Sequence, residues 1–514
     1  MTEVRDSFEI EPPWVAVEDI KETLTKDVVV IGAGTSGKAA ALSAAQAGAE
    51  VIQIDKHVTF RWSGGIIAAI DSRLQKKLGI EIDKDEVIQA LMKWGGNKPD
   101  QRLLRLWAEH SGPVMDWLMD MTDPDGIETV MYQWPQPEGY DSTTEYYPEF
   151  PVGHWHRDGT NLTLDHSLAL NCVQDHTLKL GVDIRYQTRA LRLVRQEKGR
   201  VTGVIARGKD GTLVQFNARK ALVLCTGDYG SNPAMMQKYC PVAAEVARQN
   251  NIYMVRNEDL RRSGEPLNVG DGHLMAMWIG GVMEPGPHAP MAHAALGPGG
   301  VNPYLRVNAK GRRYENEDVP GQSVANSLAR QPGKKVWQVF DAKWEDELSR
   351  MGVGLGRFYA VNEVVRGRFN ELVIKADTIE ALAEKMDVPV ETFKTTVDRY
   401  NELARLGRDL DFGKNPERLT TIENPPFYAG SLVQEFLVVL GGLNTNPNLQ
   451  MLDSEWNIIP GIYLAGNTVG NRFAVDYPTM CPGLSHGMAW TTGRLAGLSA
   501  AADNTSTGRF PISF

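Results

Sequence analysis

Residues 27–37 read DVVVIGAGTSG, and this stretch decides the fold. A short β-branched apolar run leads into a glycine-rich turn, and an alanine-rich stretch follows over residues 36–47. This order predicts a buried parallel strand that runs into a helix. A second apolar run, EVIQID at 50–55, closes a βαβ unit and ends in an acid, as a dinucleotide-binding fingerprint requires.

Three glycines of the turn, Gly32, Gly34 and Gly37, have the GxGxxG spacing of that fingerprint. They are expected to serve a tight turn, a close approach of the backbone to a pyrophosphate, and close packing of helix on strand. Asp55 is expected to bind the adenosine ribose hydroxyls. The motif by itself does not distinguish FAD from NAD.

The composition bounds the class of protein. A chain of 514 residues is long enough for two or three domains, one of them able to bury a large cofactor. The formal net charge of -10 and the lack of a Lys/Arg cluster argue against nucleic acid or an anionic membrane as partner, so a small-molecule ligand is expected. The N-terminal stretch lacks the pattern of a secretion signal and no window approaches a membrane span, which predicts a cytoplasmic protein.

The cysteines are widely separated and show no CxxC or metal-ligand spacing. They are therefore predicted to be reduced thiols, with no haem, iron–sulfur cluster or zinc site. These residues are Cys172, Cys225, Cys240 and Cys481.

Further apolar runs extend the predicted sheet. Short strands are predicted at 182–194, 200–206, 212–217 and 220–227. A sheet that leaves the fold and returns in this way is typical of two-dinucleotide flavoproteins, which favours FAD. Near the other end, residues 457–466 predict a strand and residues 483–500 a helix, so the first and last segments are predicted to build one domain.

The middle of the chain differs in character. It carries amphipathic helix patterns at 378–385 and 390–406, separated by loops rich in Gly, Pro and Asn. The predicted fold is therefore α/β: a Rossmann-like, two-dinucleotide-type FAD-binding domain with an inserted α+β capping domain. Residues 1–287 and 435–514 are expected to form the FAD-binding domain, and residues 288–434 the cap.

Over nearly its whole length the chain resembles the flavoprotein family of soluble fumarate reductases, urocanate reductases, tricarballylate dehydrogenases and 3-ketosteroid dehydrogenases. The resemblance implies an FAD domain and a mobile cap, with substrate held between them against the isoalloxazine. Beyond the glycine turn, the shared motifs are SGGI at 63–66, LCTGDYG at 224–230, VNAKGRRYENE at 307–317, KADTIEAL at 375–382 and PPFY at 425–428.

The same resemblance implies a set of cofactor-binding residues. Membrane-bound relatives carry a flavin-linked histidine where this chain reads FRWS at 60–63, so the FAD is expected to be non-covalent. The start of the last helix would point backbone N–H groups at the flavin carbonyl where negative charge gathers. The expected FAD-binding residues are Gly32, Gly34, Thr35, Ser36, Gly37, Asp55, Lys56, Ser63, Gly64, Gly65, Ala190, Thr226, Gly227, Gly466, Asn467, Gly483, Leu484 and Ser485.

Two departures from the fumarate reductase pattern bear on the substrate. The fumarate reductases share a cap arginine shortly after the Asn-Glu pair, whereas Asn316 and Glu317 are followed here by DVPGQS. Their C-terminal HGxNRxGG pattern is also not found as such, and residues 466–487 read GNTVGNRFAVDYPTMCPGLSHG instead. Fumarate is therefore expected to be a poor substrate, and this stretch is more similar to the steroid and tricarballylate branches.

Two residues are candidates for catalysis. Tyr477 could donate a proton or a hydrogen bond to a substrate carbonyl, since a phenol is a weak acid suited to polarising an enone; a packing role is the alternative. His288 falls about where relatives carry a substrate-facing histidine. Arg313 and Glu317 are expected to form a structural ion pair, and the aromatic-rich segment 132–155 either walls a substrate pocket or packs as a Pro-rich loop.

These features predict an FAD-dependent oxidoreductase that reduces or forms a carbon–carbon double bond conjugated to a carbonyl or carboxyl group. A bulky or ring-containing enone such as a 3-ketosteroid is the expected substrate, and a tricarballylate-like acid is the alternative. A non-catalytic flavin-binding protein is the alternative from another class. With no second nucleotide fingerprint, haem motif or FMN domain in the sequence, a separate electron donor or acceptor protein, or a nicotinamide, is expected as redox partner.

Overall fold

The computed structural model describes residues 6–60, 64–132, 149–159, 166–249, 268–295, 302–319, 321–351 and 373–503. The chain forms two compact units. Met1–Tyr132, Phe150–Met291 and Leu437–Phe514 make up the first, and Ala292–Phe436 is the main part of the second. Strands β10 (Pro290–Ala295) and β14 (Phe427–Val439) carry the chain from one unit to the other. The role of the second unit as a cap over substrate remains a prediction.

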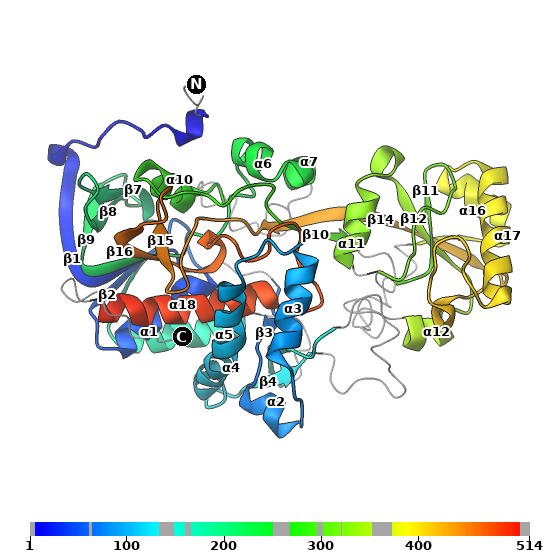
Figure 1. The fold of residues 1–514 in the computed structure, drawn as a ribbon, viewed down its shortest axis with the longest axis horizontal. Coiled ribbons are helices and arrows are strands. Elements are labelled where there is room, and N and C mark those ends of the chain that lie inside the picture. The colour runs from blue at the N-terminus through cyan, green and yellow to red at the C-terminus, as the bar shows by residue number, and fades with distance from the viewer. Residues whose placement is uncertain are drawn as a thin grey trace. The chain divides into compact units, whose positions relative to one another are not determined.

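The first unit is built on a sheet with a parallel centre (Figure 1). Strand β1 (Ile20–Ile31) lies between β2 (Val51–Ile54) and β9 (Leu213–Leu224) and runs parallel to both. Strand β16 (Ile458–Leu464) pairs with the other edge of β9, again parallel, so the C-terminal segment extends the sheet that the N-terminal segment begins. The remaining strands of this sheet are β6 (Asp183–Arg185), β7 (Arg189–Arg195), β8 (Val201–Arg207) and β15 (Gln450–Leu452).

Two helices from opposite ends of the sequence pack together along this sheet. They are α1 (Thr35–Gln46) and α18 (Leu484–Ala502), which lie side by side in Figure 1. A Cβ on Gly493 would lie 2.4 Å from the Ser36 carbonyl oxygen, and one on Gly497 would lie 2.3 Å from the Ala40 carbonyl oxygen. Only glycine fits at these contacts, which fix the distance between the two helices.

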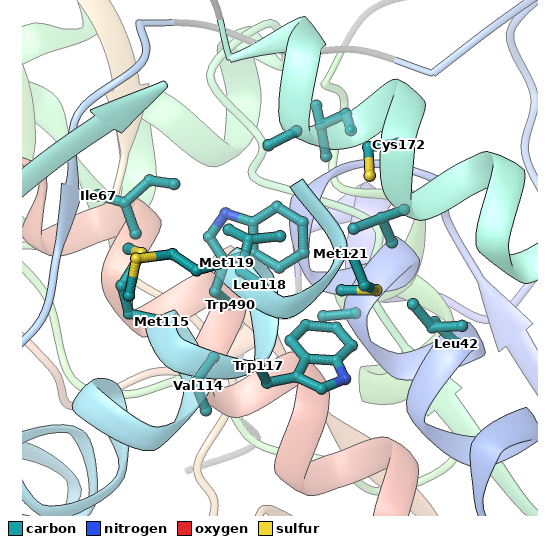
Figure 2. Packing of buried hydrophobic residues seen from close by; sticks show 14 of the residues in the cluster. Leu42, Ile67, Val114, Met115, Trp117, Leu118, Met119, Met121, Cys172 and Trp490 are labelled. Carbon is teal, nitrogen blue, oxygen red and sulfur yellow. The ribbon is translucent and has the colours of Figure 1, made fainter. Parts of the chain in front are cut away.

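An apolar cluster holds the helices of the first unit together (Figure 2). Helix α4 (Gln101–Thr122) contributes more of its side chains than any other element, and others come from α1, α18, β3 (Ile67–Ala68) and α5 (Ser167–Lys179). Trp117 of α4 meets Trp490 of α18 edge to face, with ring centroids 6.2 Å apart. Burying each large apolar side chain contributes about 1.5–3 kcal/mol to folding. The cluster therefore stabilises the packing of α4, α5 and α18 against α1, the helix that follows the nucleotide turn.

The other elements of the first unit are short. Strands β3, β4 (Ile127–Met131) and β5 (Gly153–Asp158) form a small antiparallel sheet. None of the helices in the described part of the chain is long and apolar enough to cross a bilayer. The further helices are α2 (Arg73–Lys77), α3 (Lys84–Trp94), α6 (Pro233–Tyr239), α7 (Ala244–Gln249) and α10 (Asp271–Trp278), with 3-10 turns at Ser7–Glu9, Val17–Asp19, Pro241–Ala243 and Gly466–Thr468.

The second unit combines an antiparallel sheet with helices. Strand β12 (Val336–Phe340) pairs with β11 (Leu305–Asn308) on one side and with β14 on the other, and β13 (Val373–Ala376) also pairs with β14. Its helices are α11 (Gly321–Leu328), α12 (Trp344–Met351), α16 (Ile379–Met386) and α17 (Val390–Leu406), with 3-10 turns at Pro332–Lys334 and Pro416–Arg418.

A buried ion-pair network ties this second unit together. The Arg313 guanidinium donates to Glu317 Oε1 at 2.7 Å and to Asp409 Oδ2 at 2.7 Å, and all three side chains are buried. The ion pair expected between Arg313 and Glu317 is present and lies inside the second unit. Because the Arg313 guanidinium donates to two carboxylates inside the second unit, its role is to stabilise the fold of that unit.

Candidate FAD and redox site

The nucleotide turn after β1 leaves no room for side chains. Gly32 has a φ of +109°, and a Cβ there would lie 2.2 Å from the Cys225 carbonyl oxygen. A Cβ on Gly37 would lie 2.0 Å from the Gly32 carbonyl oxygen. Gly34 precedes Thr35, the first residue of α1. The turn therefore brings backbone N–H groups at the start of a helix close to whatever binds there, which is the geometry that suits a pyrophosphate.

Asp55 follows β2 and faces this turn. Its Oδ2 accepts a hydrogen bond from the Ala33 backbone N–H at 2.7 Å, and its Oδ1 accepts one from His57 N–H at 2.8 Å. The neighbouring Lys56 pairs with Asp271 at 2.5 Å, and Arg189 pairs with the same carboxylate at 2.8 Å. The structure thus places Asp55 beside the glycine turn, and its contact with ribose hydroxyls remains a prediction.

Thr226 and Gly227 lie at the end of β9, where the strand meets the same turn. The Thr226 hydroxyl is buried and has no hydrogen-bond partner among the described residues. A Cβ on Gly272 would lie 2.0 Å from that hydroxyl oxygen, and Gly227 has a φ of +77°. Ala190, at the start of β7, is also buried. A buried polar atom without a partner, in a wall of glycines, indicates a group that a bound ligand completes.

The C-terminal segment closes the same site. Gly466, directly after β16, has a φ of +66°, and a Cβ there would lie 2.4 Å from the Ser36 hydroxyl oxygen. Its N–H donates to the Thr492 hydroxyl at 3.0 Å. Asn467 accepts a hydrogen bond from Arg472 through its Oδ1. The structure therefore brings Ser36 and Gly466 together, although about 430 residues separate them in the sequence.

The start of α18 meets the small-residue loop after β2. Gly483 caps the helix with a φ of +80°, and a Cβ there would lie 2.5 Å from the Ile66 carbonyl oxygen. His486 Nδ1 lies 3.0 Å from that oxygen, and its ring stacks on His166 with centroids 4.7 Å apart. Gly64 lies against the His486 ring, Gly65 and Leu484 are buried, and Ser63 lies outside the described residues.

Tyr477 is buried at the N-terminus of α18. Its hydroxyl oxygen accepts a hydrogen bond from the Ser485 backbone N–H at 3.2 Å, and its ring packs edge to face on Phe473 at 5.6 Å. Burial raises the pKa of the Tyr477 phenol, so it is neutral at physiological pH. Because the oxygen serves as an acceptor, the hydroxyl hydrogen can still be donated.

His288 is held by protein partners on both ring nitrogens. Nδ1 is hydrogen-bonded to the Tyr229 hydroxyl, and Nε2 lies 2.9 Å from the Glu284 carbonyl oxygen. The ring stacks on Tyr239 with centroids 5.1 Å apart, and a Cβ on Gly441 would collide with it. Burial lowers the pKa of His288 to about 4, which keeps it neutral. These contacts favour a structural role for His288, and the proposed function does not use it.

Arg472 is a residue that sequence reasoning did not place in the site. Its guanidinium is buried, with Nε donating to the Val469 carbonyl at 2.8 Å and Nη2 to Asn467 Oδ1 at 3.1 Å. Nη1 has no hydrogen-bond partner among the described residues. Burial lowers the pKa of Arg472 to about 10, against the opposing effect of Glu284, so it remains a cation at neutral pH.

Glu284 is the buried acid of this region. Its Oε1 accepts from the Gly442 N–H at 3.0 Å and its Oε2 from the Asn471 N–H at 2.7 Å. Burial raises the pKa of Glu284 to about 7, although both hydrogen bonds lower it. The sequence marks Arg472 only by the NR at 471–472 and gives no signal for Glu284, because burial cannot be read from either pattern.

The residues fit FAD. The glycine turn leaves space for a close approach to its backbone, and the Thr226 hydroxyl and the Arg472 Nη1 are buried polar atoms without partners among the described residues. A dinucleotide carries phosphate and carbonyl oxygens able to meet such groups. The expected aromatic wall is described only in part: Trp155 packs edge to face on Tyr132 at 5.7 Å, and residues 133–148 lie outside the described residues.

Comparison with known proteins agrees with this reading. The model of a family described as FAD binding domain matches residues 27–480. The vinyl phenol reductase of Lactiplantibacillus plantarum is 30% identical over 497 residues, which cover 92% of this chain and 96% of that protein. A probable fumarate reductase of Shewanella frigidimarina is 27% identical, covering 87% of this chain and 70% of that one.

Solved structures show the same fold. The 3-ketosteroid-Δ4-(5α)-dehydrogenase of Rhodococcus jostii RHA1, in complex with 4-androstene-3,17-dione, superposes with a TM-score of 0.73 at 24% identity. The match covers 95% of this chain and 99% of that chain. The predicted α/β FAD-binding fold and the resemblance to fumarate reductases and ketosteroid dehydrogenases are thereby confirmed. The chain belongs to the FAD-binding family of flavoproteins and is an FAD-dependent oxidoreductase that acts on carbon–carbon double bonds.

Proposed function

We propose that the enzyme reduces or forms a carbon–carbon double bond in a ring-containing substrate whose conjugated system ends in a single oxygen. The leading case is a bulky enone such as a 3-ketosteroid. The observation that carries this proposal is the buried Tyr477 hydroxyl, which is fixed by the Ser485 N–H at the start of α18. A tricarballylate-like acid is the alternative substrate.

FAD supplies the hydride chemistry when it is bound. Tyr477 is positioned to donate its hydrogen to a substrate oxygen or carbon, because its own oxygen already accepts a hydrogen bond. That bond comes from the first turn of a helix, where the helix dipole favours negative charge on the acceptor. The phenol is therefore supported in donating its proton, even though burial alone would oppose ionisation.

Arg472 supports a substrate with an oxygen that gains negative charge during the reaction. Its Nε donates to the Val469 carbonyl and its Nη2 to Asn467 Oδ1, and its Nη1 has no hydrogen-bond partner among the described residues. The N–H groups of Nη1 could donate to such an oxygen on the flavin or the substrate. The sequence also lacks the cap arginine and the full HGxNRxGG pattern of the fumarate reductases, which supports a substrate other than a dicarboxylate.

A second candidate is favoured by one comparison. The relative that is 30% identical over nearly the full length of both chains is a vinyl phenol reductase. A vinyl phenol also places an alkene in conjugation with a single ring oxygen, which Tyr477 and Arg472 could polarise. A separate electron-transfer protein or a nicotinamide is proposed as electron source or sink for either substrate.

Anaerobic reoxidation tests both candidates. The holoprotein is reduced with dithionite and mixed with 3-ketosteroids, vinyl phenols, cinnamates, urocanate, tricarballylate-type acids and fumarate. We expect a ring-bearing substrate with one conjugated oxygen to restore flavin absorbance fastest. If a di- or tricarboxylic acid reoxidises the flavin fastest, the proposed substrate class is wrong. If no alkene reoxidises the reduced flavin faster than buffer does, and no saturated counterpart reduces the oxidised flavin, the catalytic proposal fails.

A further inference from the structure

Three metal-ligating side chains converge in the first unit, away from the FAD turn. They are Asp125, Cys172 and His176, and one ligand atom of each lies within 4.8 Å of the others. Cys172 Sγ is 3.2 Å from Asp125 Oδ2. The sequence predicted no zinc site because its cysteines lack metal-ligand spacing. Asp125 stands far along the chain from the two helical residues, so only folding brings the three together.

Two rigid elements present these ligands. Cys172 and His176 are four residues apart on α5, so they share one face of that helix. Asp125 lies in the turn between α4 and β4, where Pro124 precedes it and Gly126 follows with a φ of +75°. The turn is closed by hydrogen bonds from Asp125 N to Thr122 O and from Gly126 N to Asp123 O. Little backbone movement is therefore needed to adjust the ligands.

We propose that Asp125, Cys172 and His176 form a binding site for one divalent transition-metal ion of zinc type, with water as the fourth ligand. Zinc binds thiolate sulfur at about 2.3 Å and carboxylate oxygen or imidazole nitrogen at about 2.0–2.2 Å, so tetrahedral ligand atoms stand about 3.4–3.6 Å apart. The observed separations are within rotamer adjustment of that value. A thiol ligand excludes Mg²⁺ and Ca²⁺, which prefer oxygen.

The burial of the three residues suits an entry path from solvent. Cys172 is buried and belongs to the apolar cluster in Figure 2, His176 is half-buried and Asp125 is exposed. The thiol gives up its proton to solvent when it binds the metal. Asp175 contributes further negative charge near the thiol and Lys179 a positive charge, so the site is not flanked by acids alone.

A metal here would join the α4–β4 turn to α5, and α5 reaches the nucleotide turn. Gln174, on α5, accepts hydrogen bonds from Lys38 Nζ at 2.5 Å and from the Tyr186 hydroxyl at 2.6 Å. Lys38 lies in the first turns of α1. We therefore expect metal binding to raise the thermal stability of the FAD-loaded protein by mass action.

The test uses the FAD-loaded protein after treatment with a chelator. Titration with Zn²⁺ in a calorimeter is expected to show one equivalent bound, and Co²⁺ is expected to give ligand-field bands at wavelengths longer than those at which oxidised flavin absorbs. Asp125→Asn, Cys172→Ser and His176→Gln should each raise the dissociation constant by at least about tenfold, since even outer-shell partners of a metal contribute about 10–100-fold.

Matched controls separate this site from adventitious binding. Asp123→Asn changes the same turn and Cys240→Ser removes another buried thiol, and both should bind Zn²⁺ like the parent. Asp125 is exposed, so Asp125→Asn tests the site even if a change at buried Cys172 weakens the fold. Absence of stoichiometric Zn²⁺ binding, or binding that all three ligand variants retain, would overturn the proposal.

Discussion

Removing the Tyr477 hydroxyl is the most informative perturbation, because rate and stability should respond by different amounts. Tyr477→Phe keeps the ring that packs on Phe473 and deletes the oxygen that accepts from Ser485 N–H at 3.2 Å. Proton transfer by a positioned side chain contributes about a hundred- to ten-thousand-fold, which corresponds to about 3–5 kcal/mol of barrier. The lost hydrogen bond should cost only about 1 kcal/mol of folding free energy.

The assay is single-turnover reoxidation of the reduced flavin by the best substrate from the anaerobic screen, with FAD content and thermal midpoint measured on the same samples. Tyr463→Phe is the control, since Tyr463 lies in β16 of the same unit and is equally buried. We expect a large loss of rate in Tyr477→Phe alone, with FAD still bound. If its rate constant matches that of the parent, the reasoning is refuted, and the proton must come from another group.

Four further outcomes are expected. Acid precipitation should release the flavin into the supernatant, and flavin left in the pellet would contradict non-covalent binding. Gly37→Ala should lower FAD content strongly, because its Cβ would lie 2.0 Å from the Gly32 carbonyl oxygen, whereas Gly321→Ala has nothing within 4 Å and should load normally. Fumarate should turn over at least about a hundredfold more slowly than the best ring-containing substrate, since a second buried carboxylate without a cation costs several kcal/mol; comparable steady-state rates would count against this. Burial raises the pKa of Glu284 from 4.5 to about 7, so protonation of Glu284 stabilises the folded state in acid, and this stabilisation is lost as the pH rises from about 4.5 to about 7. In denaturant unfolding between about pH 5 and 8, Glu284→Gln should make the pH-dependent decrease in the free energy of unfolding smaller by up to about 3 kcal/mol. A decrease as large as that of the parent would point to other groups.

The elements that the sequence placed well carry their own boundary signals. Helix α17 was predicted at 390–406 and is observed at Val390–Leu406, because Pro389 precedes it and Gly407 ends it with a φ of +66°. The nucleotide turn was also predictable, since a Cβ at Gly32 or Gly37 would lie only 2.0–2.2 Å from a carbonyl oxygen and these positions therefore require glycine. In both cases the local chemistry of one or two residues decides the structure.

The strand ends could not be predicted in the same way. Residues 212–217 and 220–227 were predicted as separate strands, but β9 runs unbroken over Leu213–Leu224. The charged Arg219 marked a break in the apolar pattern, yet it is accommodated at the surface by Asp27 at 2.7 Å and Glu50 at 2.6 Å. Strand β1 likewise begins at Ile20 rather than at 27, because its polar first half pairs with β9 outside the buried core. Tertiary pairing overrode local polarity at both places.

The site shows the same limit for function. Sequence pattern pointed to Tyr477 and His288 with similar reasoning, and the fold separates them: Tyr477 retains a hydrogen to donate, whereas both His288 nitrogens have partners inside the unit. Asn471 and Arg472 repeat only the NR of the HGxNRxGG pattern, so the motif did not place Arg472 in the site, and its proposed role follows from its burial and from an Nη1 without a partner among the described residues. Whether a side chain has spare hydrogen-bonding capacity is a property of its surroundings, and a single sequence does not contain it.

The segment between β16 and α18 links enclosure of the cofactor to the chemistry. Gly466 at its start packs on Ser36 of the nucleotide turn, and Gly483 at its end packs on the Ile66 backbone. Between these two anchors lie Arg472 and Tyr477, each tied to the segment's own backbone or to the start of α18. Both anchors require glycine, because a Cβ would lie 2.4 Å from the Ser36 hydroxyl oxygen at Gly466 and 2.5 Å from the Ile66 carbonyl at Gly483. The groups proposed to act on the substrate, at 472 and 477, therefore lie on a segment whose two ends are anchored within the first unit.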